Sequence, residues 1–130
     1  MKALSLKQPF AELLATGKKT IELRFWNTHF RGRFLIHASG NIDFDSCSEL
    51  KIDPKGLARG AIIGGAVLFD VKMYPGAKEF YKDSSKHLAT SKYFNKDKKQ
   101  YGFIIKDPVK FAKPIAMPGK LGFFYVDMKI

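Results

Sequence analysis

The alternation of apolar and polar positions predicts a chain built mainly from short β-strands. In residues 20–26 the apolar positions are Ile21, Leu23 and Phe25, and the positions between them are polar or amphipathic. A period of two is typical of a strand whose two faces meet different surroundings. Similar alternation, or a high content of β-branched residues, predicts further strands at residues 33–39, 61–71, 101–106 and 121–128.

A short helix is predicted from Pro9 to Thr16, where the apolar period lengthens. Three apolar side chains fall on one face of this helix, namely Phe10, Leu13 and Leu14. Pro9 suits the first position of a helix, and Gly17 suits the residue just beyond its end. The apolar face is expected to pack against the strands.

Together these elements predict a mixed β fold with short helices, of the α+β class. Several short strands with few helices are typical of a small closed β-barrel, with the helix packed at its side. The polar stretches 43–59 and 75–99 are expected to form helical or loop insertions between strands. Gly64 and Gly65 lie inside the stretch 61–71, where glycine permits a bulge or a bend.

Length and composition fit a single domain over residues 1–130. Hydrophobic residues make up 45% of the chain, which is enough for one core. No apolar run approaches the roughly 20 residues that span a bilayer, and Lys7 and Pro9 interrupt the N-terminus too early for a signal peptide. Cys47 is the lone cysteine and fits a reducing compartment. The protein is therefore expected to be cytoplasmic and not bound to a membrane.

The chain has a formal net charge of +11, from 23 basic and 12 acidic side chains. Residues 1–40 carry seven basic and two acidic groups, and residues 71–113 carry eleven and four. Such a field attracts polyanions. In residues 92–101 lysines interleave with aromatic side chains, which suits a phosphate backbone with stacked bases. The alternatives are a generic lysine-rich surface and a solvated loop.

Three candidate ligand-binding residues share one face of the strand at residues 20–26, namely Glu22, Arg24 and Trp26. Neighbours on one face of a strand lie about 7 Å apart. Because the opposite face is apolar and must seek the core, this face is expected to point toward water or a cleft. Trp26 suits base stacking or, alternatively, packing beneath the loop 27–32.

Further candidate ligand-binding residues flank this strand, namely Ser5, Lys7, Gln8 and Lys19. Lys7 and Gln8 are expected at the start of the helix, where free backbone N–H groups favour an anion. Cations, one carboxylate and an amide together suit a phosphate or carboxylate next to the hydrogen-bonding edge of a base. The alternative is a solvated strand face with a Glu22–Arg24 ion pair.

His37 is the last candidate ligand-binding residue, on the strand at residues 33–39. It is expected to be satisfied by neighbouring groups or, alternatively, to serve as a cleft-lining hydrogen-bond partner or general acid/base. His29 and His87 fall in expected turns or helices and are predicted to be exposed. Three scattered histidines and one cysteine lack the spacing of metal ligands, so no metal and no cofactor are predicted.

Several stretches of the sequence resemble the ASCH domain family. The family pattern Gly-x-Lys-x-x-Glu-x-Arg is present as Gly17, Lys19, Glu22 and Arg24. Other matching stretches are Ser5–Phe10, Arg31–Ala38, Tyr101–Phe103 and Pro118–Phe124. The Ser-x-x-Gln-Pro opening and the segment around His37 look most like the branch of the endothelial-overexpressed lipopolysaccharide-associated factors.

The resemblance implies a PUA-like β-barrel with a cleft beside the first helix and a role in binding RNA or a nucleotide-like ligand. One branch of the family hydrolyses the amide of N4-acetylcytidine with a lysine, a threonine nucleophile and a distant glutamate. Lys19 matches that lysine, but Glu22 occupies the threonine position. The expected function is therefore a binding module. The alternatives are a small hydrolase of N-acylated nucleosides or a ribonuclease, with Lys19 and Glu22 as catalytic residues, and a domain that binds an acidic protein.

Overall fold

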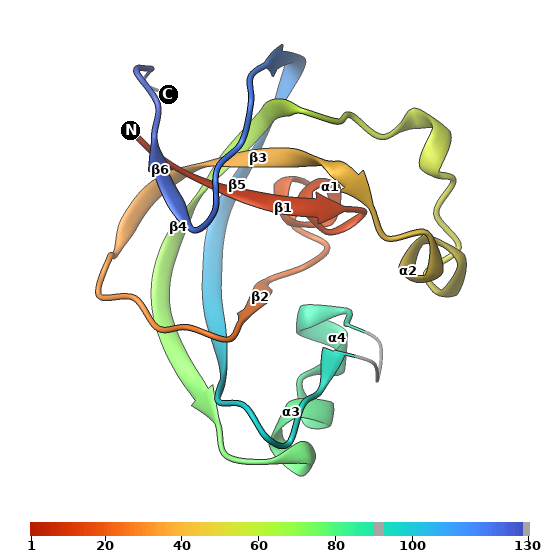
Figure 1. Ribbon diagram of the computed structural model, residues 1–130, viewed down its shortest axis with the longest axis vertical. Coiled ribbons are helices and arrows are strands. Elements are labelled where there is room, and N and C mark those ends of the chain that lie inside the picture. The colour runs from red at the N-terminus through yellow and green to blue at the C-terminus, as the bar shows by residue number, and fades with distance from the viewer. Residues whose placement is uncertain (90–92, 129–130) are drawn as a thin grey trace.

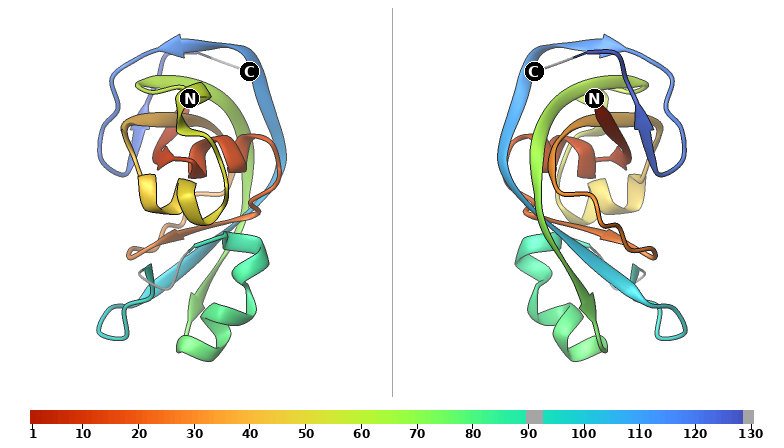
Figure 2. Two further views of the ribbon diagram at one scale, coloured as in Figure 1. Left: turned by 90° about the vertical axis from the view of Figure 1, so that its right-hand side faces the viewer. Right: turned by 90° about the vertical axis from the view of Figure 1, so that its left-hand side faces the viewer.

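A six-stranded sheet dominates the computed structural model, which describes residues 1–89 and 93–128. The strands are β1 (Lys2–Gln8), β2 (Ile21–Arg24), β3 (Gly32–Ile42), β4 (Ala61–Tyr74), β5 (Gln100–Ala116) and β6 (Phe123–Tyr125). Their order is β2-β5-β4-β3-β1-β6, with β1 and β3 parallel and the other neighbours antiparallel. The sheet curls strongly, so that β4 and β5 arch around the helix α1 (Phe10–Ala15) (Figure 1, Figure 2).

Short helices occupy the two polar insertions. The connection between β3 and β4 contains α2 (Phe44–Glu49) and the 3-10 helix η1 (Pro54–Gly56), and that between β4 and β5 contains α3 (Ala77–Lys82) and α4 (Ser84–His87). No helix among the described residues has the length and apolar character needed to cross a membrane.

The predicted α+β class, with a sheet and short helices, is confirmed. Closure into a barrel is not confirmed, because β2 and β6 stand at opposite ends of the hydrogen-bonded strand order among the described residues. Both edge strands are short, with four and three residues. The curled shape therefore comes from the bending of the long strands β4 and β5, of 14 and 17 residues.

The core lies where α1 packs into the concave side of the sheet. The predicted apolar face of α1 is buried, together with Ala11 and Ala15, against side chains of β1, β3, β4 and β5. α1 ends as predicted before Gly17, whose φ of +81° is a left-handed conformation that favours glycine. This packing places the C-terminal end of α1 next to the beginning of β2.

Residues 2–8 form a strand that the local pattern did not predict. β1 pairs in parallel with β3, with Ala3 opposite Leu35 and Leu6 opposite Ala38. Lys7 and Gln8 therefore lie at the end of a strand, and their expected place at the start of a helix is wrong. The reason is that a partner more than 30 residues away decides the conformation of this segment.

The predicted irregularity at Gly64 and Gly65 is confirmed. The register between β4 and β5 shifts between Ile62 and Gly64 and again between Gly65 and Val67. Such bulges bend a strand locally, as expected for a strand that changes direction.

Candidate functional site

A pocket with a volume of about 350 Å³ opens beside β1, β2 and α1. Six of the eight predicted ligand-binding residues line it, namely Ser5, Lys7, Lys19, Glu22, Arg24 and Trp26. The remaining lining residues are Phe10, Leu23, Phe25, Ala89 and Tyr93. The pocket therefore combines three cations and one carboxylate with four aromatic rings, and its volume is within the range of small-ligand sites.

The Glu22 carboxylate lies between two cations. Lys19 Nζ is 3.4 Å from Glu22 Oε1, and Arg24 Nη2 is 2.9 Å from Glu22 Oε2. Arg24 Nε also donates to Glu22 Oε2 at 3.0 Å, and Arg24 Nη2 donates to the Ser5 carbonyl oxygen at 2.8 Å. These bonds hold the three charged side chains in one arrangement and tie Arg24 of β2 to the backbone of β1.

Lys19 is the deepest charged group of the site, with a side chain only 2% exposed. Its ammonium donates to the His87 carbonyl oxygen at 2.6 Å and lies 5.1 Å from the centroid of the Phe10 ring. Burial lowers the pKa of Lys19, although the nearby Glu22 carboxylate raises it and Arg24 lowers it further. Lys19 is therefore held in place and gives up its proton more readily than an exposed lysine.

Trp26 belongs both to the pocket and to the core. Its ring packs edge-on against Phe103 at 5.3 Å and Phe123 at 5.8 Å between centroids. Arg24 Cζ lies 5.9 Å from the Trp26 ring. The tryptophan thus rests against β5 and β6, and not simply beneath the loop 27–32.

The predicted division of β2 into two faces holds only in part. Ile21 is buried as expected, but Phe25 is 47% exposed, and Glu22 is only 8% exposed. Leu23 and Phe25 line the pocket and do not pack in the core. The reason is that β2 is an edge strand, which among the described residues pairs in the sheet with β5 alone. It ends at Arg24, so its alternation does not extend to residue 26.

Gln8 does not line the pocket. Its side chain is fully buried, with Nε2 donating to the Ala58 carbonyl oxygen at 3.0 Å and Oε1 accepting from the Glu12 backbone N–H at 2.9 Å. The amide oxygen thus accepts from one of the N-terminal N–H groups of α1, which the sequence predicts to face an anion. Gln8 supports the local fold and makes no surface available to a ligand.

His37 also lies behind the pocket lining, with 1% exposure. Its Nε2 donates to the Met117 carbonyl oxygen at 2.7 Å, which leaves Nδ1 to accept from Ser5 Oγ at 2.9 Å. A Cβ added to Gly119 would lie 2.6 Å from His37 Cε1, so glycine lets this segment cover the pair. His37 therefore orients Ser5 and does not itself reach the pocket.

His87 is buried, which contradicts the predicted exposure, whereas His29 is exposed. The His87 Nδ1 accepts from the Ala89 backbone N–H at 3.0 Å, and its Nε2 donates to the Phe80 carbonyl oxygen at 2.8 Å. Burial lowers the pKa of His87. The fixed ring holds the His87 backbone in place, and its carbonyl oxygen accepts the hydrogen bond from the Lys19 ammonium. The helix α4 thus contributes to the site through its backbone.

Tyr93 is a lining residue outside the predicted ligand-binding set, although the run that contains it was singled out for its aromatics and lysines. It lies in the aromatic and lysine-rich run 92–101, of which Lys92 is outside the described residues. The Tyr93 ring packs edge-on against Phe10 at 5.7 Å, and its hydroxyl donates to Asp43. From the same run, Lys98 Nζ lies 5.0 Å from the Phe25 ring. Part of the run therefore borders the pocket.

Within the described residues, no group of three or more histidine, cysteine or acidic side chains is placed to hold a metal ion.

Comparison with known proteins gives a family and a fold. The family model of the ASCH domain matches residues 4–114. Activating signal cointegrator 1 of Mus musculus is 28% identical over 139 residues, covering 98% of this chain and 22% of that protein. The chain thus spans about a fifth of the length of this curated relative.

Solved structures with a similar fold come from Zymomonas mobilis. The ASCH protein of that organism superposes with a TM-score of 0.70 at 18% identity, covering 96% of this chain and 86% of the other. Its tyrosine-to-phenylalanine mutant gives 0.69 at 18% identity, with 96% and 88% covered. Its serine-to-alanine mutant gives 0.66 at 20% identity, with 89% and 73% covered. At these identities the likeness concerns the fold alone.

Proposed function

This chain belongs to the ASCH domain family, and we propose that it is a PUA-like module that binds RNA or a nucleotide-like ligand in the pocket beside β2. The observation that carries the proposal is the composition of this pocket. Aromatic rings form much of its wall, while Lys7 and Arg24 add positive charge and Glu22 adds a hydrogen-bond acceptor. Single-stranded RNA is recognised in this way, by stacking of bases and by contacts to phosphates and base edges.

In the proposed complex each part of the site takes a different part of a nucleotide. A base stacks on Phe25 or Trp26, and the amino or imino hydrogens of its edge approach Glu22. Lys7 is exposed at the end of β1 and takes the phosphate. Lys19 and Arg24 orient Glu22 and contribute positive potential. Ser5 lies at the rim, while Gln8 and His37 act only as supports.

Salt-sensitive binding to single-stranded RNA is the first test of this proposal. The logarithm of the binding constant should fall with the logarithm of salt concentration, with a slope of about −0.7 for each phosphate contact. Lys7→Ala should weaken binding to all sequences and reduce the slope by about one contact. Filter binding of a mixed RNA pool at about 50 mM and about 200 mM salt measures both quantities.

Lys78→Ala is the matched control, because Lys78 is exposed on α3 and lines neither this pocket nor the neighbouring one. Equal losses in the two variants would mean that only the overall charge attracts RNA. No binding by the wild-type protein at low salt would contradict the proposal and leave the net charge as a feature of solubility.

A small hydrolase of N-acylated nucleosides is the alternative function. The observation that favours it is the lowered pKa of the buried Lys19, because a lysine that loses its proton readily can act as a general base. Against it stands Glu22, whose two oxygens already face Lys19 and Arg24. A carboxylate in this position also cannot form the ester that a threonine nucleophile forms.

We therefore expect only marginal hydrolysis of N4-acetylcytidine by the wild-type protein. Chromatographic detection of cytidine over several hours measures this reaction, with Lys19→Ala and Glu22→Gln as comparison variants. Rapid turnover that both substitutions abolish would make the hydrolase the primary function. A ribonuclease activity would cut the RNA pool into shorter fragments. The same variants, Lys19→Ala and Glu22→Gln, test whether these residues are needed for that cleavage.

Further features belong to this proposal. We place the chain nearest the branch of the endothelial-overexpressed lipopolysaccharide-associated factors, on the basis of Ser5, Gln8, Pro9 and the segment around His37. We also propose a single domain over residues 1–130 whose curled sheet acts as a PUA-like barrel. The lone and buried Cys47 supports a cytoplasmic location.

A further inference from the structure

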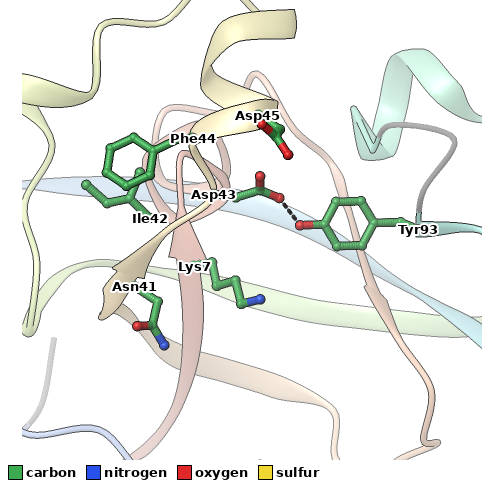
Figure 3. Close-up of a pocket in the computed structure, with 7 residues that line it drawn as sticks. All are labelled: Lys7, Asn41, Ile42, Asp43, Phe44, Asp45 and Tyr93. Atoms are coloured by element: carbon green, nitrogen blue, oxygen red, sulfur yellow. Dashed lines mark hydrogen bonds between the residues drawn. The ribbon is translucent and has the colours of Figure 1, made fainter.

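A second pocket adjoins the first and shares two of its residues. It has a volume of about 560 Å³, and the seven residues that line it are drawn in Figure 3. Lys7 and Tyr93 belong to the linings of both pockets. One side of Tyr93 meets Phe10 in the first pocket, while its hydroxyl donates to Asp43 in the second. The two pockets therefore adjoin at Lys7 and Tyr93.

The parallel pairing of β1 and β3 builds this second pocket. Gln8 pairs with Ile42, and the Asp43 backbone N–H donates to the Gln8 carbonyl oxygen at 2.8 Å. The ends of both strands thus meet at one edge of the sheet, which brings Lys7 next to Asn41. Asp43 then begins α2, where its side chain accepts from the Ser46 backbone N–H at 3.1 Å.

The chemistry of the second pocket differs from that of the first. Its described lining includes two carboxylates, Asp43 and Asp45, and one cation, Lys7. Lys7, at the border with the first pocket, attracts a phosphate. Phe44 is 60% exposed at the rim and offers a ring face for stacking, and Asn41 offers an amide that can donate and accept. A nucleoside, with a flat base to stack on Phe44 and a hydrogen-bonding edge to meet Asn41, fits these two groups.

We propose that the second pocket takes the neighbouring nucleotide of a single-stranded chain. The ligand is then an oligonucleotide of at least two nucleotides, and not a mononucleotide or a free nucleoside. One base occupies the first pocket, the linking phosphate lies at Lys7, and the next base stacks on Phe44 with its edge toward Asn41. This inference rests on the proposed function of the first pocket and extends it to a ligand class.

A comparison of uridine 5′-monophosphate with the 5′-phosphorylated uridine dinucleotide tests the proposal. NMR chemical-shift titration of the full chain measures both dissociation constants, even in the millimolar range. One additional stacked base should make the dinucleotide bind about tenfold more tightly. The backbone resonances of residues 41–45 should shift with the dinucleotide and not with the mononucleotide.

Phe44→Ala and Asn41→Ala should remove this gain and leave the affinity for the mononucleotide unchanged. Phe69→Ala is the control, because Phe69 is a similarly exposed phenylalanine, 56% exposed on β4, and lines neither pocket. Equal affinities for the two ligands would contradict the proposed role of the second pocket and leave the proposed function of the first intact. A gain in affinity that survives Phe44→Ala and Asn41→Ala would have the same meaning. Failure of both ligands and of the RNA pool to bind would overturn the proposed function together with this extension.

Discussion

Replacement of Gly64 by alanine is expected to lower the free energy of unfolding by at least about 3 kcal/mol. A Cβ at this position would lie 2.1 Å from the carbonyl oxygen of Val109 and 3.3 Å from Lys110 Cα. These are backbone atoms of β5, which cannot rotate away as the end of a side chain can. Gly64 pairs with Lys110, so relief of the clash requires β4 and β5 to separate at this pair of residues.

Urea unfolding followed by circular dichroism measures this change, and thermal unfolding should show a decrease of roughly 10 °C or more. Gly40→Ala is the matched control. Gly40 lies on β3, and a Cβ added there would have no neighbouring atom within 4 Å among the described residues. Its effect is expected to stay within about 0.5 kcal/mol. If the two variants unfold alike, the close approach of β4 and β5 at Gly64 is not a property of the folded protein.

The success at Gly64 shows which features a single sequence can predict. Two adjacent glycines within a β-rich stretch indicate a bulge because glycine inside a strand often marks a bulge, a tight bend or the close approach of another backbone. The helix α1 was predictable for a similar reason, since its apolar period, Pro9 and Gly17 are all local signals. Each of these features depends on residues close together in the chain.

β1 shows what local signals leave out. Leu4 and Leu6 alternate with Ser5 and Lys7, yet so short a run is compatible with more than one conformation. Its pairing with residues 35–42 of β3 decides that it is a strand. Closure of the barrel is a similar question, because it depends on the edge strands β2 and β6, which are far apart in the sequence.

The candidate site was predictable to the same extent. The spacing of Lys19, Glu22 and Arg24 places three charges on one turn and strand, and the structure brings them together. The exposure of Gln8 and His37 could not be predicted, because Ala58 and Met117, their distant hydrogen-bond partners, bury them. Tyr93 reaches the pocket through the tertiary fold alone. The sequence thus indicates the residue types of the site, and for His37 also a ring satisfied by its neighbours, while the tertiary fold decides how deeply each side chain lies.

Glu22→Gln is expected to have the largest effect among substitutions of the pocket's charged residues. It leaves the buried Lys19 and the partly buried Arg24 without the carboxylate that both approach. Removal of one partner from a buried ion pair typically costs about 3–5 kcal/mol. The loss should be about 3 kcal/mol, at the lower end of this range, because Lys19, whose pKa burial already lowers, can release its proton.

Glu12→Gln is the matched control for the urea unfolding of this variant. Glu12 Oε2 is 2.8 Å from Lys110 Nζ, but the lysine side chain is 51% exposed. Such a surface pair contributes at most about 1 kcal/mol. Similar losses in the two glutamine variants would contradict the buried arrangement of Lys19, Glu22 and Arg24.

The pH dependence of the loss gives a further test of the same substitution. Lys19 in the folded protein has a pKa below its ordinary value of 10.5, and loss of Glu22 removes a group that raises it. Between the folded and the ordinary pKa the unfolded chain binds more protons, so stability rises with pH in this window. Because the folded pKa of Lys19 is lower still in Glu22→Gln, this rise begins at a lower pH in the variant, and its deficit relative to the wild-type protein should narrow between the two folded pKa values, below 10.5. A deficit that stays constant over this range would mean that Lys19 keeps its proton, and that Glu22 acts through its hydrogen bonds and not through its charge.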